Sequence, residues 1–158
     1  MTQSDVEGGL ELAGPARSGC PINLATEVLG DRWSLLVMRD LAFGGPRHYR
    51  DLLAGSLEGI ASNILVGRLE KLTAVGLLSR HPVPGHRQQV QYRLTEPGIQ
   101  LLPILVALAS WAVRWLPADP ELAQAAIDLR EPVAQQAFMD ELRRTHLGDS
   151  RHGGHAQP

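Results

Sequence analysis

Apolar residues recur at a helical spacing through most of the first half of the chain, after a start that has no periodicity. We expect residues 1–19, which lack this spacing, to form a flexible tail. Proline at a first helical position and glycine after a last one mark the ends of the helices that follow. The pattern predicts a helix from Pro21 to Gly30, a helix capped by Asp31 that closes at Gly44-Gly45-Pro46, a short helix over 47–54 and a strong helix over 61–75.

The spacing changes after Gly76, which stands where a helix-ending glycine belongs. Residues 77–80 and 89–94 have the character of strands. The stretch 81–88 between them is rich in proline, glycine and basic residues, which is typical of a turn. These residues together predict a β-hairpin with a basic tip.

Helical spacing returns at Thr95, which can cap a long helix that runs to about Trp115. Pro103 lies early in this helix and should kink it. A further amphipathic helix is expected over 119–146, with a division at Pro132. The polar residues 147–158 are expected to be a disordered tail.

The order of these elements is that of a winged helix-turn-helix, in which a helix-turn-helix is followed by a hairpin. We therefore expect a mainly α fold with a small β-hairpin, in the α+β class. The expected parts are a tail over 1–19, a winged helix-turn-helix domain with the long helix over 20–116, a helical extension over 117–146 and a second tail over 147–158.

Composition indicates a globular protein, since 44% of the residues are hydrophobic and 20% are charged. The longest apolar stretches are interrupted before the roughly 20 residues that span a bilayer, and the N-terminus is not typical of a secretion signal. We expect no transmembrane helix. A single cysteine excludes an intramolecular disulfide, and a cytoplasmic location is the natural expectation.

The net charge of −2 hides an uneven distribution. Residues 17–95 carry ten Lys and Arg against six Asp and Glu, whereas residues 96–158 carry five against eight. A local basic field steers a protein to phosphate. Ordinary scatter of charge would produce the same counts, so the distribution alone does not decide between these interpretations.

The helix over 61–75 offers a face that can contact DNA. Leu65, Leu69 and Leu72 share one stripe, which we expect to be buried. The exposed face near the start of the helix carries Ser62, Asn63, Val66, Gly67 and Arg68. Asparagine can pair with adenine and valine can meet a thymine methyl group. A glycine within a helix costs about 1 kcal/mol relative to alanine, and close approach to DNA would explain it. A frayed first turn for Asn63 and an ion pair for Arg68 are the alternatives.

Two further sets of residues are placed to meet the DNA backbone. They are His86, Arg87 and Gln88 at the hairpin tip, and Arg47, His48 and Arg50 at the start of the short helix. Arg87 is the best single candidate for a minor-groove or phosphate contact, with a solvated loop as the alternative. The set at the short helix could clamp phosphate.

Seven groups of residues occur in an order that is specific as a whole. They are Cys20-Pro21, Gly30-Asp31-Arg32-Trp33, Arg47-His48-Tyr49-Arg50-Asp51-Leu52, Gly59-Ile60-Ala61-Ser62-Asn63-Ile64-Leu65 with Arg68-Leu69, Gly76-Leu77-Leu78, Tyr92-Arg93-Leu94-Thr95-Glu96-Pro97-Gly98, and Leu102-Pro103-Ile104-Leu105 with Trp111. Over about residues 20–115 the chain thus resembles the HxlR-type winged helix-turn-helix regulators of bacteria. The resemblance implies a homodimer, held mainly by the first helix and the long helix after the hairpin. It also implies that helix 61–75 lies in the major groove, with half-sites about 34 Å apart.

Cys20 matches a cysteine that is common in this family, some members of which sense oxidants or electrophiles. A helix N-terminus can lower the pKa of a thiol and make it reactive, and an inert packed cysteine is the alternative. The helix expected over 119–146 extends the chain beyond the plainer family pattern. It could buttress the dimer or line an effector pocket.

The sequence therefore favours a sequence-specific transcriptional regulator, expected to be a repressor, that binds a pseudo-palindromic operator as a homodimer in the nucleoid. A small-molecule or oxidant effector is left open. A winged-helix module for protein–protein contacts without DNA binding is the main alternative, and a MarR-type regulator is a near neighbour. Neither a base for Cys20, a glycine-rich phosphate loop nor a tight Cys/His metal spacing is identifiable. We group His146 with His152 and His155 as tail residues, although it is also the last residue of the helix expected over 119–146. We expect no catalysis, cofactor, metal or membrane partner.

Overall fold

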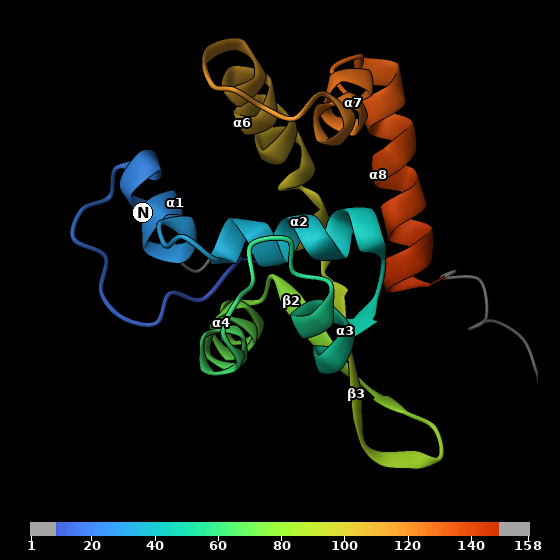
Figure 1. Ribbon diagram of the computed structural model, residues 1–158. Helices are drawn as coiled ribbons and strands as arrows, with labels where there is room; N and C mark the ends of the chain where they lie inside the picture. The colour runs from blue at the N-terminus through green and yellow to red at the C-terminus, as the bar shows by residue number, and fades with distance from the viewer. Residues whose placement is uncertain (1–8, 149–158) are drawn as a thin grey trace, which may run out of the picture.

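The computed structural model describes residues 9–148, which are mostly helical with one small antiparallel sheet (Figure 1). The elements are α1 (Pro21–Leu29), α2 (Ser34–Gly44), β1 (Arg47–His48), α3 (Tyr49–Ala54), α4 (Ser62–Val75), β2 (Leu78–Val83), β3 (His86–Leu94), α5 (Glu96–Ile99), α6 (Leu102–Trp115), α7 (Pro120–Asp128) and α8 (Pro132–Leu147). In Figure 1, α3, α4 and the sheet lie below α2, whereas α6, α7 and most of α8 lie above it. The predicted mainly helical class with a small sheet is confirmed.

The sheet has three strands in the order β1-β3-β2, whereas the sequence pattern predicts only the two-stranded hairpin. Arg47 in β1 lies opposite Tyr92 in β3, and Leu78 in β2 lies opposite Leu94 in β3. The two residues of β1 are too few for an alternating pattern to reveal a strand. The prediction of a helix over 47–54 was therefore wrong for its first two residues.

The hairpin turn is shorter than the predicted stretch 81–88. Strand β2 continues to Val83 and β3 begins at His86, so the turn is confined to the two residues between them. Gly85 in this turn has a φ of 81°, a left-handed conformation that glycine adopts without strain. Pro82 suggested a loop, but β2 is an edge strand, where a missing N–H is tolerated.

The leucine stripe of α4 lies at the centre of the core, as predicted. Leu65, Leu69 and Leu72 are buried and belong to one cluster with Leu41 of α2 and Leu94 of β3. Burying a side chain of this size contributes about 1.5–3 kcal/mol. The core therefore holds α4 with its opposite face towards solvent.

The predicted long helix over 95–115 is divided at Leu101 into α5 and α6. Leu101 N donates to Gly98 O at 3.2 Å and Ile104 N donates to Leu101 O at 3.0 Å, each three residues back along the chain. A regular α-helix bonds four residues back. Pro103 has no N–H for such a bond, which explains why the predicted interruption falls here.

Helices α7 and α8 form a C-terminal arm, which is divided just before Pro132 as predicted. Figure 1 shows α7 beside α6 and α8 running back towards the end of α2. Asp119 caps α7 by accepting hydrogen bonds from Glu121 N and Leu122 N. The expected helix over 119–146 is thus two helices, the second of which continues to Leu147.

His146 is not in a tail, and this prediction was wrong. It lies in the last turn of α8 and only 1% of it is exposed. A histidine near the end of an amphipathic pattern has no sequence feature that separates burial from exposure. The other two histidines expected in the tail, His152 and His155, lie outside the described residues.

Residues 9–19 form no helix or strand. Glu11 N nevertheless donates to Val75 O at 3.1 Å, and Leu12 packs against the core. This part of the expected tail is therefore attached to the end of α4. Residues 1–8 and 149–158 lie outside the described residues.

Among the described residues, the stretch Glu96–Trp115 is long and apolar enough to cross a membrane by length and composition alone, with a mean hydropathy of 1.4. The sequence pattern predicts no such stretch. One helix of this kind is weak evidence for a membrane protein, because core helices of soluble proteins pass the same test. Here Ile99, Leu102 and Val106 lie in the hydrophobic core.

Candidate nucleic-acid interface

The face of α4 opposite the leucine stripe is exposed. It carries Asn63, Val66, Gly67 and Glu70, and Ser62 is exposed beside it as the first residue of the helix. A Cβ atom added at Gly67 would meet nothing within 4 Å. Glycine at this position is therefore not required by the packing of the described residues, although it weakens the helix. A polar face with room for close approach is suited to the major groove of DNA.

Tyr49 connects the start of α3 to the start of α4. Its hydroxyl lies 2.5 Å from Ser62 Oγ and also donates to Ser62 O at 3.4 Å. This contact fixes the first turn of α4, where the exposed polar residues begin. The sequence pattern did not single out Tyr49 for this role, and only its place beside Arg47 and His48 could have suggested it.

Arg68 lies against the turn between α1 and α2. Its guanidinium is 3.4 Å from Asp31 Oδ2, and Lys71 Nζ is 3.1 Å from the same oxygen. The Asp31 carboxylate also accepts hydrogen bonds from Trp33 N and Ser34 N, so it caps the start of α2. The ion pair that was the alternative for Arg68 is thus present, and it joins α4 to the α1–α2 turn.

The pKa of Asp31 reflects these contacts. Burial raises this pKa, but the hydrogen bonds from Ser34, Trp33 and Lys71 more than offset the effect of burial and lower the pKa to about 2. The carboxylate is therefore charged at neutral pH. It holds two basic side chains of α4 on the side that faces the protein.

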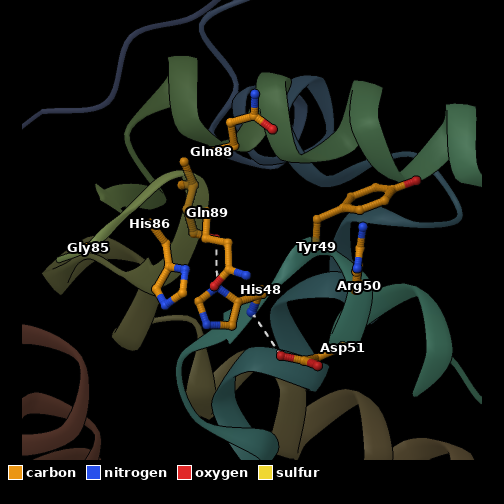
Figure 2. Close-up of a pocket in the computed structure, with 9 residues that line it drawn as sticks. His48, Tyr49, Arg50, Asp51, Gly85, His86, Gln88 and Gln89 are labelled. Carbon is orange, nitrogen blue, oxygen red and sulfur yellow. Dashed lines mark hydrogen bonds between the residues drawn. The ribbon is translucent and has the colours of Figure 1, made fainter. Parts of the chain in front are cut away.

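A hollow of about 720 Å³ separates the first turn of α3 from the wing, the β2–β3 hairpin (Figure 2). The lining residues are His48, Tyr49, Arg50, Asp51, Gly85, His86, Gln88, Gln89 and Val90. His48 Nδ1 lies 3.0 Å from Val90 O, and His48 N donates to Asp51 Oδ2 at 3.3 Å. The hollow thus brings together His48 and Arg50 with His86 and Gln88, two sets that the sequence pattern placed separately.

Arg47, one of the arginines predicted at the start of the short helix, is not among the residues that line this hollow. Arg47 folds back to the end of α2, where its Nε donates to Gly44 O at 3.3 Å. A Cβ atom at Gly44 would overlap the Arg47 guanidinium, so glycine makes room for this arrangement. Arg87 lies in β3, on the strand that borders the wing turn.

A second hollow of about 390 Å³ lies between α4 and the sheet. Its lining residues are Tyr49, Val66, Leu69, Glu70, Thr73, Arg80 and Tyr92. Tyr49 lines both hollows, so the two hollows lie on either side of this residue. Arg80 was not predicted as a site residue, because the sequence pattern placed it within a strand and not at the wing tip.

Cys20 is exposed and precedes the first residue of α1. Backbone hydrogen bonds from Asn23 and Ile22 lower the pKa of its thiol. This is the effect expected of a helix N-terminus. Within residues 9–148, His, Cys, Asp and Glu form no group of three or more that could hold a metal ion.

A helix-turn-helix built from α3 and α4, followed by a β-hairpin, defines a winged helix-turn-helix protein. The model of the HxlR-like helix-turn-helix family matches residues 28–120. The chain belongs to this family, and it is a transcriptional regulator of the winged helix-turn-helix type. The family and the named relatives are regulators and not enzymes.

An HTH-type transcriptional regulator of Mycobacterium tuberculosis is 37% identical to the chain over 131 residues, which is 83% of this chain and 79% of the relative. One from Synechocystis is 35% identical over 97 residues, covering 61% of this chain and 70% of the relative. Among solved structures, that of PA1607, described as a transcription factor, has a TM-score of 0.58 and 36% identity, covering 66% of this chain and 70% of PA1607. The reduced form of the regulator YodB from B. subtilis has a TM-score of 0.54 and 27% identity, covering 65% of this chain and all of YodB. The predicted fold and family are thus confirmed.

Proposed function

We propose that the protein binds a pseudo-palindromic operator as a homodimer and represses transcription, with α4 in the major groove. The observation that carries this proposal is the exposed face of Asn63, Val66 and Gly67, where glycine serves no packing purpose. Asn63 is suited to adenine and Val66 to a thymine methyl group. Ser62, held by Tyr49, lies at the start of the same helix, where its main chain can meet phosphate.

The wing and α3 bind the DNA backbone on either side of the hollow between them. His48 at the end of β1 and Arg50 in the first turn of α3 approach from one side, and His86, Arg87 and Gln88 approach from the wing. Contacts of this kind position a protein on DNA without reading its sequence. Arg47 and Arg68 have partners within the protein, so we assign them weaker roles in DNA binding.

The dimer forms through α1 and α6. Exposed apolar residues of α6 are spaced by four, three and four positions, which places them on one face of the helix. They are Ile104, Leu108, Trp111 and Trp115. Trp111 is 58% exposed, and Ile22 on α1 is 76% exposed. A second copy that covers this stripe would remove a large apolar surface from water. The resulting regulator acts in the cytoplasm, on the nucleoid.

Equilibrium binding to the promoter region upstream of the protein's own gene, measured over a range of salt concentrations, tests this proposal. A regulator that neutralises phosphates loses affinity steeply as salt rises. It also prefers one fragment over unrelated DNA. A winged-helix module for protein contacts alone would show no binding at any salt concentration, and that outcome would replace the proposal.

We further propose that oxidation of Cys20 modulates this regulator. The support is its exposure together with the lowered pKa of its thiol, which favours the reactive thiolate. Mild oxidation should release DNA from the wild type and not from Cys20→Ser. If the Cys20→Ser protein still releases DNA on oxidation, Cys20 is not the oxidant sensor.

A further inference from the structure

Helix α6 is joined to the rest of the protein through the interruption at Leu101. Leu102 and Val106 anchor its first turns in the core, whereas Leu108, Trp111 and Trp115 further along are exposed. A proline removes one hydrogen bond of the helical ladder, so α6 is not held in line with α5 by a continuous ladder. The direction of α6 therefore depends on what packs against its outer part.

The C-terminal arm packs against this outer part. Helix α7 lies against α6, and its Ala123 and Ala126 are buried. Beyond α7, Arg130 Nε donates to Ser110 Oγ of α6 at 2.9 Å. The arm thus holds α6 on the far side of the interruption.

The same arm is attached to the winged unit, which comprises α2–α4, the sheet and α5. Arg143 of α8 pairs with Glu96 of α5, with 2.8 Å between Nη2 and Oε1. The buried His146 bonds to the main chain of α2 and of β3, through Leu41 O and Leu94 N. These contacts lie before the interruption in the chain.

Phe138 adds an apolar contact to the polar ones. Its ring stacks on that of Phe43 in α2, with 5.6 Å between the ring centroids. The arm therefore bridges the interruption, because it is fastened to the winged unit at one end and to α6 at the other. Most of the arm lies beyond the region that the family model matches, residues 28–120.

We propose that the arm is a brace that fixes the angle between α6 and the winged unit, and that it thereby determines which half-site spacing the dimer accepts. This inference rests on the proposed function, since it requires a dimer that holds one α4 on each half-site. Each α4 is carried by its own winged unit, so a change in the α6 angle moves the two recognition helices relative to each other. Half-sites must lie about one helical turn apart for both helices to enter the groove. Arg130, Arg143 and His146 are positioning residues in this scheme.

An intramolecular distance tests the brace without DNA. Spin labels at Ala74→Cys on α4 and Arg114→Cys on α6, in a Cys20→Ser background diluted with unlabelled protein, report the angle within one protomer. We expect a narrow distance distribution that broadens in Arg143→Ala/His146→Ala, which removes the polar contacts between α8 and the winged unit and leaves only the apolar ones. The control Gln136→Ala/Thr145→Ala changes exposed residues of the same helix and should leave the distribution narrow.

If the double variant fails to fold, Ser110→Ala/Arg130→Ala removes the contact at the other end of the brace, between a half-buried serine and an exposed arginine, and should also broaden the distribution. A distribution that stays narrow, although hydrogen exchange shows α8 detached, would overturn the brace. An unchanged distribution in Ser110→Ala/Arg130→Ala, which lacks the Ser110–Arg130 contact, would also overturn the brace.

Affinity for operators of different half-site spacing tests the consequence. The wild type should prefer one spacing, and this preference should fall by about tenfold in Arg143→Ala/His146→Ala, equivalent to about 1.4 kcal/mol. Dimerisation and affinity for non-specific DNA should not change. An unchanged preference contradicts the brace alone, whereas a wild type that binds no DNA contradicts the proposed function and leaves the distance measurement to decide on the brace.

Discussion

Leu94 and His146, 52 residues apart in the chain, share a buried hydrogen bond of 3.0 Å between Leu94 N and His146 Nδ1. Because Leu94 N is the donor, the ring proton resides on Nε2, which donates to Leu41 O at 3.1 Å. One neutral imidazole thus joins α8 to β3 and α2. Burial lowers the pKa of His146 to about 4; the hydrogen bond to Leu41 opposes this effect, and the charge of Arg93 adds to it.

We predict that His146 makes the protein less stable in mild acid. The folded-state pKa of His146 lies below its usual value of 6.5, so the unfolded chain takes up a proton at a pH where the native state does not. The contribution of neutral His146 is complete above pH 6.5 and is lost as the pH falls to about 4, on the order of 3 kcal/mol in total. Urea unfolding at several pH values measures it.

The variant His146→Ala isolates this effect from the carboxylates that titrate in the same range. At pH 7 the variant should be less stable by about 2–4 kcal/mol, because it leaves a cavity and two unpaired main-chain groups. This difference should shrink as the pH falls towards 4. A difference that stays constant with pH would show that His146 is not held neutral. The exposed His81→Ala should cost no more than about 0.5 kcal/mol at pH 7.

Asp31→Asn should reduce the free energy of unfolding at pH 7 by about 1–2 kcal/mol. The amide keeps the shape of the side chain but loses the charge that holds Arg68 and Lys71. Urea unfolding of Glu70→Gln, which removes an exposed charge from the same helix, is the matched control. A loss no larger than that of the control would mean that Asp31 does not fasten α4 to the α1–α2 turn.

Gly67→Ala should change stability and DNA affinity in opposite directions. A methyl group at this position meets nothing within 4 Å, so alanine should stabilise α4 by up to about 1 kcal/mol. The same methyl group should obstruct the approach of α4 to DNA and weaken operator binding. Thermal unfolding and operator affinity measure the two effects, and Ala74→Gly, at an exposed position outside the DNA-facing surface, controls for helix propensity. Unchanged operator affinity would remove Gly67 from the interface.

Arg80→Ala should weaken binding to all DNA sequences alike and reduce the salt dependence by about one phosphate contact. Arg80 lines the hollow between α4 and the sheet, where the DNA backbone would pass. The slope of log affinity against log salt is the measurement. Arg17→Ala, which removes a charge outside the interface, is the control. A slope equal to that of the wild type would place Arg80 outside the DNA footprint.

Most of the fold could be predicted from helical periodicity, because the buried face of α4 forms the centre of the core. A stripe such as Leu65, Leu69 and Leu72 is visible in sequence whenever one face of a helix is buried. The exposed face of Asn63, Val66 and Gly67 followed from the same geometry and needed no further information. Strand β1 was not predicted, because it has too few residues to show any periodicity in the sequence.

The contacts that organise the candidate interface are mostly long-range, and no local pattern contains them. Tyr49 meets Ser62 across a turn, and Lys71 meets Asp31 from 40 residues away. The buried state of His146 depends on two main-chain groups from distant elements. Pairings of this kind depend on how helices pack, which a single sequence does not specify.

Competition binding with Asn63→Ala tests operator recognition by α4 most directly. The wild type should prefer an operator, selected from genomic fragments, over unrelated DNA of equal length. Asn63→Ala should lose about 1–3 kcal/mol of affinity for the operator through one base pair, and little for unrelated DNA. A wild type that binds both DNAs equally, or a variant that loses the same affinity on both, would contradict operator recognition by α4.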